Sequence, residues 1–206
     1  MDVVSVRVKI CGVRRLADAE AAVAAGADFL GLNFHPPSPR YVEPEAAADL
    51  AAALPGVAFV GVFVDLPRAE VERIAARVGL AALQFSGDED PAYCVGWPWR
   101  TVKTLHLAPG TDVSTLAARY ATDYLMADAF VPGLAGGTGV ALDPALTAGL
   151  PRERLFVAGG LRPETVAEVV RRLRPYAVDV ASGVESRPGE KDHAKLKDFI
   201  HRAKAA

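Results

Sequence analysis

The chain has 206 residues, of which 51% are hydrophobic and 23% charged, and its formal net charge is −2. This composition is typical of a globular protein and gives no sign of attraction to nucleic acid or membranes. No apolar run reaches the roughly 18 residues of a membrane span, and the start lacks a signal-peptide pattern. Two distant cysteines and four scattered histidines indicate neither a disulfide framework nor a metal site. We therefore expect one domain over residues 1–206, cytoplasmic, without metal, and with no nucleic-acid or membrane partner.

Strand-like and helix-like segments alternate along the chain. Residues 6–12, V-R-V-K-I-C-G, alternate as a strand does, and residues 14–25 follow with helical spacing. The remaining strands are expected at 28–34, 57–64, 81–86, 100–106, 123–128, 155–158 and 176–181. The remaining helices are expected at 44–54, 67–78, 88–95, 112–120, 143–149, 163–173 and 191–203, with a glycine-rich loop at 130–140.

Eight strand–helix units predict an α/β fold of the (β/α)8 type, a TIM barrel. A doubly wound open sheet would show the same alternation, but it typically has fewer strands and a phosphate loop after the first. Here Gly12 is followed by Val13, Arg14 and Arg15, and the chain contains neither G-x-G-x-x-G nor G-x-x-x-x-G-K after this strand. The barrel is therefore the preferred interpretation.

Several strands carry a polar residue between apolar neighbours, which in a barrel would point inward or toward the mouth. Barrel closure makes the first and eighth strands neighbours, and a buried charge is costly unless it is paired. We therefore expect Lys9 and Asp179 to pair, the alternative being that such residues face solvent at a strand end. The polar strand residues are Lys9, Asn33, Gln84, Lys103, Asp128 and Asp179.

Two residues at the ends of strands suit acid–base chemistry. Cys11 ends the first strand just before a turn into a helix, where a helix N-terminus would favour the thiolate. Asp128 ends the sixth strand, and active sites of parallel barrels form at the carboxyl ends of their strands. The structural alternatives are a small buried hydrophobe for Cys11 and a turn residue for Asp128.

Two glycine-rich stretches follow the last two strands. Gly159 and Gly160 come after the seventh, and Ser182 and Gly183 after the eighth. In barrels these two loops often hold a phosphate, so they predict a phosphorylated small-molecule ligand. Arg40, on the second loop, suits a ligand carboxylate, although many such arginines are only surface charges.

Taken together, the motifs resemble the phosphoribosylanthranilate isomerase family. The shared stretches run over nearly the whole chain and are V-K-I-C-G, G-A-D-F-L-G-L-N-F, S-P-R, V-G-V-F-V-D, G-D-E, D-A with G-G-T-G, A-G-G-L-x-P, and V-D-V-A-S-G-V-E with P-G-x-K-D. The resemblance implies an Amadori rearrangement in tryptophan biosynthesis. N-(5-phosphoribosyl)anthranilate would become 1-(2-carboxyphenylamino)-1-deoxyribulose 5-phosphate without a metal or cofactor.

The resemblance also implies roles for particular residues. Cys11 matches the general base that takes the proton from C2 of the sugar, and Asp128 matches the general acid that opens the furanose ring. Arg40 matches the group that holds the anthranilate carboxylate, and Asp179 an acid that supports the substrate site. The phosphate loops match at Gly159, Gly160, Ser182 and Gly183.

Three positions depart from the family pattern. Ser86 stands where a histidine is common, Leu142-Asp143-Pro144 where F-D-W is common, and Ala181 where serine or asparagine is frequent. Two alternatives remain open: a histidine-pathway phosphosugar isomerase, which usually has Asp in place of Cys11, and a non-catalytic phosphate-binding barrel. The sequence is compatible with a monomer or a homodimer.

Overall fold

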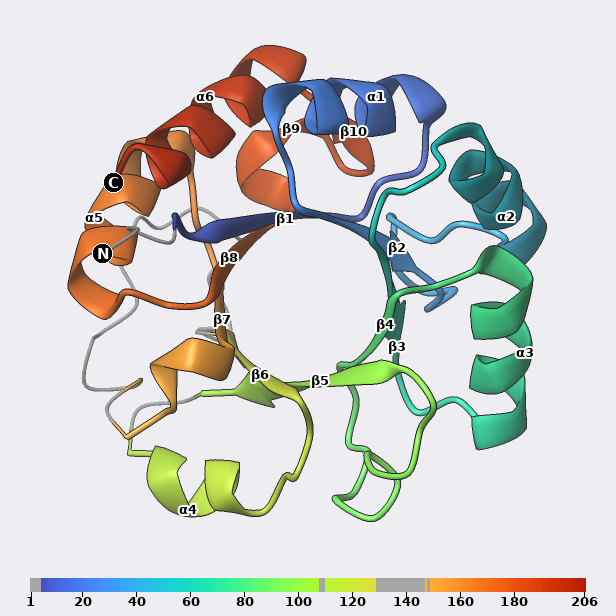
Figure 1. Ribbon diagram of the computed structural model, residues 1–206, viewed down its shortest axis with the longest axis vertical. Helices are drawn as coiled ribbons and strands as arrows, with labels where there is room; N and C mark the ends of the chain where they lie inside the picture. Colours follow the sequence, from blue (N-terminus) through green and yellow to red (C-terminus); the bar gives the residue numbers. More distant parts are fainter. Residues whose placement is uncertain (1–4, 108–109, 129–146, 148) are drawn as a thin grey trace.

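The fold is a closed barrel of eight parallel strands in the order β1 to β8, with helices around the outside (Figure 1). The computed structural model describes residues 5–107, 110–128, 147 and 149–206. The predicted (β/α)8 barrel is therefore confirmed. Its strands are β1 (Arg7–Cys11), β2 (Phe29–Asn33), β3 (Phe59–Phe63), β4 (Ala82–Phe85), β5 (Arg100–His106), β6 (Tyr124–Asp128), β7 (Leu155–Ala158) and β8 (Ala177–Val180).

The helices cover the outer face of the barrel and bury apolar side chains against it. Short-range signals set several of their ends: Gly26 and Gly79 end α1 and α3 at positive φ, and Asp192 accepts from two backbone N–H groups at the start of α6. In the described part of the chain the α-helices are α1 (Leu16–Ala25), α2 (Pro44–Ala53), α3 (Arg68–Val78), α4 (Val113–Ala118), α5 (Pro163–Leu173) and α6 (His193–Lys204).

Shorter elements lie just before β7 and after β8. A 3-10 turn at Arg152–Arg154 leads into β7, and another at Ser182–Val184 follows β8. A small antiparallel hairpin, β9 (Glu185–Arg187) and β10 (Glu190–Lys191), then precedes α6. This hairpin returns the chain to β1, because the side chain of Lys191 reaches the carbonyl oxygen of Cys11.

The helix expected at 88–95 is wrong. Residues 91–94 form turns instead, and the carboxylate of Glu89 accepts hydrogen bonds from the backbone N–H groups of Asp65 and Gly87. The N–H of Tyr93 is bonded to the side chain of Asp90. These side-chain partners replace the helical backbone pattern. The expected loop at 130–140 lies outside the described residues, as does the expected helix at 143–149 apart from residues 147 and 149.

The amino end of the barrel is closed by aromatic rings. Phe29, Tyr124, Phe156 and Tyr176 pack on one another with ring centroids 4.8 to 6.5 Å apart. They cover an interior cluster that includes Met126. Because this end is filled with apolar groups, the polar residues of the strands gather toward the other end, where the strands finish.

Candidate active site

The predicted acid–base residues both lie at the carboxyl rim of the barrel. Cys11 is the last residue of β1, Asp128 is the last residue of β6, and both are half-buried. Parallel strands of a closed barrel all finish at the same rim, so the two residues lie at the same end of the molecule. This is the end where barrel active sites are built.

The predicted pairing of Lys9 and Asp179 is confirmed. They are register partners on β1 and β8, and Lys9 Nζ donates to Asp179 Oδ1 over 2.8 Å. Their side chains are only 1% and 9% exposed. Burial opposes the charge on the ammonium, but Asp179 and Cys11 outweigh it and raise the pKa of Lys9. Lys9 is therefore a buried cation inside the barrel, beneath its mouth.

The Cys11 thiol lies against this cation. A Cβ atom built on Gly31 would stand 3.0 Å from both Cys11 Sγ and Lys9 Nζ, so glycine at this position of β2 leaves room for the two groups side by side. Burial raises the pKa of Cys11, Lys9 opposes the rise and Asp179 adds to it. The expectation that a helix N-terminus favours the thiolate is wrong, because α1 begins only at Leu16. Two buried lysines favour the Cys11 thiolate, Lys9 more strongly and Lys191 less.

The Asp128 carboxyl must hold a proton to act as an acid, whereas the thiol must lose one to act as a base, and the surroundings of Asp128 suit this need. Burial raises its pKa, the neighbouring His106 of β5 opposes the rise, and Asp179 adds to it. A carboxyl group whose pKa is raised holds its proton to higher pH, as a general acid needs. Asp179 thus acts electrostatically on both Cys11 and Asp128, which indicates that β8 brings the two ends of the site together.

Arg40 lies beside this site with one edge of its guanidinium already occupied. Its Nε and Nη2 donate to the two carboxylate oxygens of Glu185 over 2.8 and 2.7 Å. A Cβ atom on Gly12 would stand 2.5 Å from Arg40 Cδ, so the arginine packs directly on the turn after β1. Arg40 is therefore held in a fixed orientation, with its Nη1 and the remaining Nη2 hydrogen free of Glu185.

Lys191 contacts Glu185, the carboxylate partner of Arg40, and two backbone oxygens. Its Nζ donates to Cys11 O over 2.6 Å, to Ala181 O over 3.2 Å and to Glu185 Oε1 over 3.0 Å. The side chain is 0% exposed. Lys191 therefore joins the ends of β1 and β8 and contacts the carboxylate that holds Arg40.

The two predicted phosphate loops lie in contact with each other. Gly159 and Gly160, after β7, have φ of 89° and 65°, which favour glycine. A Cβ atom on Gly183 would stand 1.9 Å from Leu161 O, so the loop after β8 packs against the loop after β7. Ser182 is exposed at the start of its 3-10 turn. The sequence prediction that these glycines belong to one place is supported, and their phosphate role stays a prediction.

Ser86, where the family commonly has histidine, is tied into a polar layer. Its Oγ lies 2.9 Å from Thr104 Oγ1 and accepts from Gln84 Nε2 over 3.1 Å. An imidazole does reach this region, because His106 Nε2 lies 3.1 Å from Ser86 O. The histidine at this part of the mouth therefore comes from β5.

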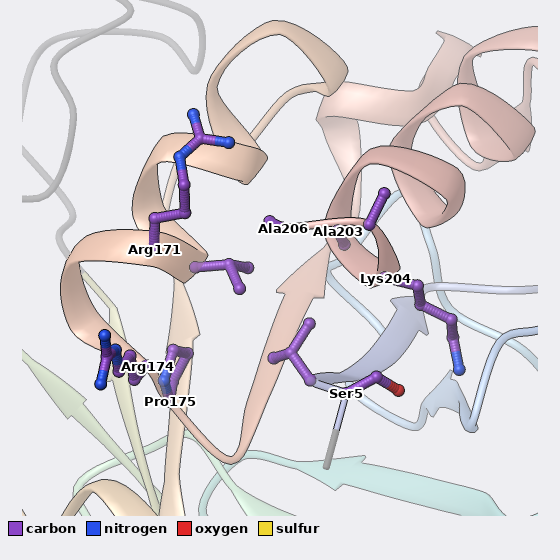
Figure 2. Close-up of a pocket in the computed structure, with 10 residues that line it drawn as sticks. Ser5, Arg171, Arg174, Pro175, Ala203, Lys204 and Ala206 are labelled. Atoms are coloured by element: carbon purple, nitrogen blue, oxygen red, sulfur yellow. The ribbon is translucent and has the colours of Figure 1, made fainter. Parts of the chain in front are cut away.

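A groove at the opposite end of the barrel holds none of these residues. It has a volume of about 940 Å³ and lies between the ends of α5 and α6, beside the start of β1 (Figure 2). Arg171, Arg174 and Lys204 project around it. Since the residues are at the amino ends of the strands, the groove is not part of the site described above.

Sequence reasoning missed the roles of Glu185, Lys191 and His106. Glu185 and Lys191 stand in stretches quoted for their resemblance, but neither shows the alternation of a buried strand. Only their burial indicates a role, because a buried charge needs a partner, and their burial is known only from the structure. His106 could have been noticed as the residue that ends the fifth strand.

The described residues contain no cluster of three or more His, Cys, Asp or Glu side chains that could hold a metal ion. None of the helices in that same part of the chain is long and apolar enough to cross a membrane.

The fold and site define a TIM-barrel enzyme with acid–base groups at the carboxyl rim. The family model for N-(5'-phosphoribosyl)anthranilate isomerase matches residues 8–202. The isomerase of Thiobacillus denitrificans is 46% identical over 206 residues, covering 98% of this chain and 100% of its own. The isomerase of Pseudomonas fluorescens is 45% identical, covering 96% and 98%. This chain belongs to the phosphoribosylanthranilate isomerase family.

Solved structures agree with this assignment. The crystal structure of the Thermotoga maritima isomerase matches with a TM-score of 0.89 and 37% identity, covering 98% of this chain and 100% of the other. A further isomerase structure, in complex with reduced 1-(o-carboxyphenylamino)-1-deoxyribulose 5-phosphate, matches with a TM-score of 0.85 and 35% identity, with the same coverage. The activity is the isomerisation of an aldose derivative to a ketose derivative, a step of tryptophan biosynthesis.

Proposed function

We propose that Cys11 and Asp128 are the base and the acid of this isomerisation. The observation that carries the proposal is their shared position at the rim, with Asp179 acting electrostatically on both. The buried ammonium of Lys9 gives Cys11 a cation that stabilises its thiolate. Burial of Asp128 raises its pKa and so favours the protonated carboxyl that donates.

The chemistry follows in two proton transfers. Asp128 protonates the furanose ring oxygen while the bond from that oxygen to C1 breaks, and the anthranilate nitrogen supplies the electron pair that forms a C1=N iminium. The Cys11 thiolate then takes the proton from C2, and the C–H electrons form a C1–C2 double bond while the nitrogen regains its pair. The resulting enol becomes the ketone by gaining a proton at C1 and losing its hydroxyl proton, and proton exchange with water restores the Cys11 thiolate and the protonated Asp128, so substrate and product have the same atoms and electrons.

The remaining predicted residues position the two ends of the substrate. Arg40 holds the anthranilate carboxylate with the N–H groups that Glu185 leaves free. The backbone around Gly159, Gly160 and Gly183, with the exposed Ser182, holds the phosphate. Asp179 supports the site by keeping Lys9 charged.

We also propose that the chain is a single domain located in the cytoplasm. The pairing of β1 with β8 makes the barrel one closed unit from the first strand to the last. Both cysteines, Cys11 and Cys94, are free thiols, which suits a reducing compartment.

The test is the loss of substrate fluorescence, followed with purified Cys11→Ala and Asp128→Asn. Each should lower kcat by about a hundred- to ten-thousand-fold, the usual worth of one acid–base group. Circular dichroism and inhibition by inorganic phosphate should stay close to wild type, because neither change touches the phosphate loops. A variant that keeps its rate within about threefold of wild type would remove that residue from the mechanism, since the loss would be far below the range just given.

A further inference from the structure

Glu185 and Arg40 alone make a poor site for an anion. The pair is bidentate, at 2.8 and 2.7 Å, so the carboxylate of Glu185 balances the charge of the guanidinium. A substrate carboxylate that approaches Arg40 would also approach Glu185, and like charges repel. The structure answers this problem with a third charged group.

Lys191 contacts the same carboxylate oxygen of Glu185, Oε1, that accepts from Arg40 Nε. Its Nζ lies 3.0 Å from Glu185 Oε1, and the two side chains are 0% and 4% exposed. Its two other partners are the carbonyl oxygens of Cys11 and Ala181. Three acceptors match the three N–H donors of an ammonium group, whereas a neutral amine would offer only two. Burial lowers the pKa of Lys191, the Glu185 carboxylate opposes this change, and the three acceptors around Nζ are those that suit an ammonium group. With Lys191 charged, the three side chains together carry one net positive charge.

We propose that Lys191 is a positioning residue that neutralises Glu185 and so leaves Arg40 available to the carboxylate of the substrate. Glu185 occupies the Nε–Nη2 edge of Arg40 and thereby directs the other edge to the ligand. The inference rests on the proposed role of Arg40 and adds the two buried residues that make this role possible. We call these three residues the Lys191–Glu185–Arg40 chain.

Variants that remove a charge test the Lys191–Glu185–Arg40 chain. Lys191→Met leaves Glu185 and Arg40 with no net charge, and it should raise KM and the inhibition constant of anthranilate by roughly tenfold, the effect of losing one charge-assisted contact. Because Lys191 also contacts Ala181 O, beside the phosphate loop, the inhibition constant of inorganic phosphate is measured in parallel. It should rise by less than about threefold, because no charged partner of the phosphate is lost.

The double variant Lys191→Met/Glu185→Gln separates charge from structure. It returns the net charge of the three positions to one, while the amide oxygen can still accept from Arg40. KM should therefore recover to within about threefold of wild type, a difference worth less than one hydrogen bond. A residue that only braces the fold would give no recovery, since the double variant removes two buried contacts.

Lys195→Met is the matched control. Lys195 Nζ donates to the backbone oxygen of Glu185 over 3.2 Å, and its side chain is half-exposed at 51%. Lys195→Met removes one positive charge near Glu185, as Lys191→Met does, but it removes no contact with the Glu185 carboxylate. All three constants should stay at their wild-type values. If Lys191→Met does not fold, Lys191→Gln replaces it, because its amide can still donate to Cys11 O while it carries no charge.

Three results would overturn the inference: an unchanged KM in the Lys191 variant, a phosphate constant that rises as much as KM, or no recovery in the double variant. Arg40→Ala separates this failure from that of the proposed function. If Arg40→Ala raises KM and the Lys191 variant does not, only the Lys191–Glu185–Arg40 chain is rejected. If Arg40→Ala leaves KM unchanged, the assignment of the carboxylate site itself fails.

Discussion

At the scale of single residues, burial has opposite consequences for the proposed base and the proposed acid. Burial raises the pKa of the Cys11 thiol, so the thiolate that the reaction needs is the minor form near neutral pH. Burial also raises the pKa of the Asp128 carboxyl, which favours the protonated form that an acid needs. The active species combines the thiolate with the protonated carboxyl, which makes the pH profile informative.

The shape of this profile follows from the signs of the two shifts. At a pH below the pKa of Asp128 the carboxyl is already protonated, so lowering the pH further only reduces the thiolate fraction and kcat/KM decreases. Between the two pKa values the loss of protonated carboxyl and the gain of thiolate cancel, so kcat/KM is constant. It declines again only above the thiol pKa, which lies above the ordinary value of about 8.5.

We therefore expect kcat/KM to stay level through pH 8 and its alkaline decline to move to lower pH in Cys11→Asp. The replacement carboxyl group titrates several pH units below a thiol. Steady-state rates over a range of buffers, with substrate stability checked without enzyme, measure both limbs. An alkaline limb that Cys11→Asp leaves in place belongs to another group and contradicts the assignment.

At the scale of elements, the site depends on loops that pack on each other more closely than a side chain allows. Gly183 is the clearest case, because a Cβ atom there would stand 1.9 Å from Leu161 O. The neighbour is backbone, which cannot rotate away as a side chain can. The loop after β8 must therefore shift if any other residue stands at this position.

Gly183→Ala should accordingly weaken phosphate binding. We expect the inhibition constant of inorganic phosphate and KM to rise by about tenfold or more, the cost of misplacing one or two backbone donors. Gly56→Ala is the control for backbone strain alone: a Cβ atom there meets nothing within 4 Å, but the φ of 85° disfavours alanine, and the residue precedes β3 at the end opposite the rim. It should lower stability and leave phosphate binding unchanged. Equal inhibition by phosphate in the two variants would place the phosphate elsewhere.

The junction of α1 and α6 gives a second prediction at this scale, on stability. Asp18 is fully buried and accepts from Arg15 over 2.8 Å, from the Lys191 backbone N–H over 3.2 Å, and lies 2.9 Å from His193 Nε2. Burial opposes its charge, but these hydrogen bonds outweigh it and lower the pKa of Asp18. The stabilisation is therefore present above the unfolded value, about 3.9, and is lost as the pH falls through the folded pKa.

Asp18→Asn should lower the free energy of unfolding at pH 7 by about 1–3 kcal/mol, the cost of a lost charge-assisted hydrogen bond. The difference between variant and wild type should shrink as the pH falls below about 4. Urea unfolding at several pH values measures it, with Asp198→Asn, from an exposed pair on α6, as the control. A difference that is constant with pH would show that the Asp18 charge is not responsible.

How far the sequence predicts these elements depends on how local their causes are. The eight strands follow from alternation and apolar runs, and the helix ends from Pro163, Asp192 and the glycines that end α1 and α3. The segment 88–95 was mispredicted because its conformation is set by Glu89, whose partners lie on β5 and on the loop after β3. No local spacing carries that information.

The site shows the same division. Cys11, Asp128 and the glycines were predicted because each stands at the end of a strand, and barrel topology makes those ends meet. The bond between Arg40 and Glu185 joins residues 145 positions apart, one on the loop after β2 and the other on the short strand β9 after the barrel. The register of the barrel fixes the strands but not the loops, so this contact was not predictable from the sequence pattern.

At the scale of the whole molecule, one ion pair lies both at the junction where the barrel closes and beside the proposed base. Lys9 and Asp179 were predicted to pair because the first and last strands of a closed barrel are neighbours, and they lie in register between β1 and β8. The ammonium group of Lys9 also lies beside the Cys11 thiol. Stability and catalysis therefore share a residue and can be separated only by removing both members of the pair.

Lys9→Met should lower the free energy of unfolding by about 3–5 kcal/mol, because it leaves the Asp179 carboxylate buried without its partner. Lys9→Met/Asp179→Leu should recover most of this loss, since two apolar side chains can replace a buried pair. Its kcat should nevertheless stay about a hundredfold or more below wild type, because the Cys11 thiolate has lost its cation. Thermal unfolding and steady-state rates measure both, with Arg172→Met, from an exposed pair on α5, as the control that should change neither. A double variant that remains as unstable as the single one would show that closure needs the charges themselves, and one that regains full activity would show that Cys11 does not need Lys9.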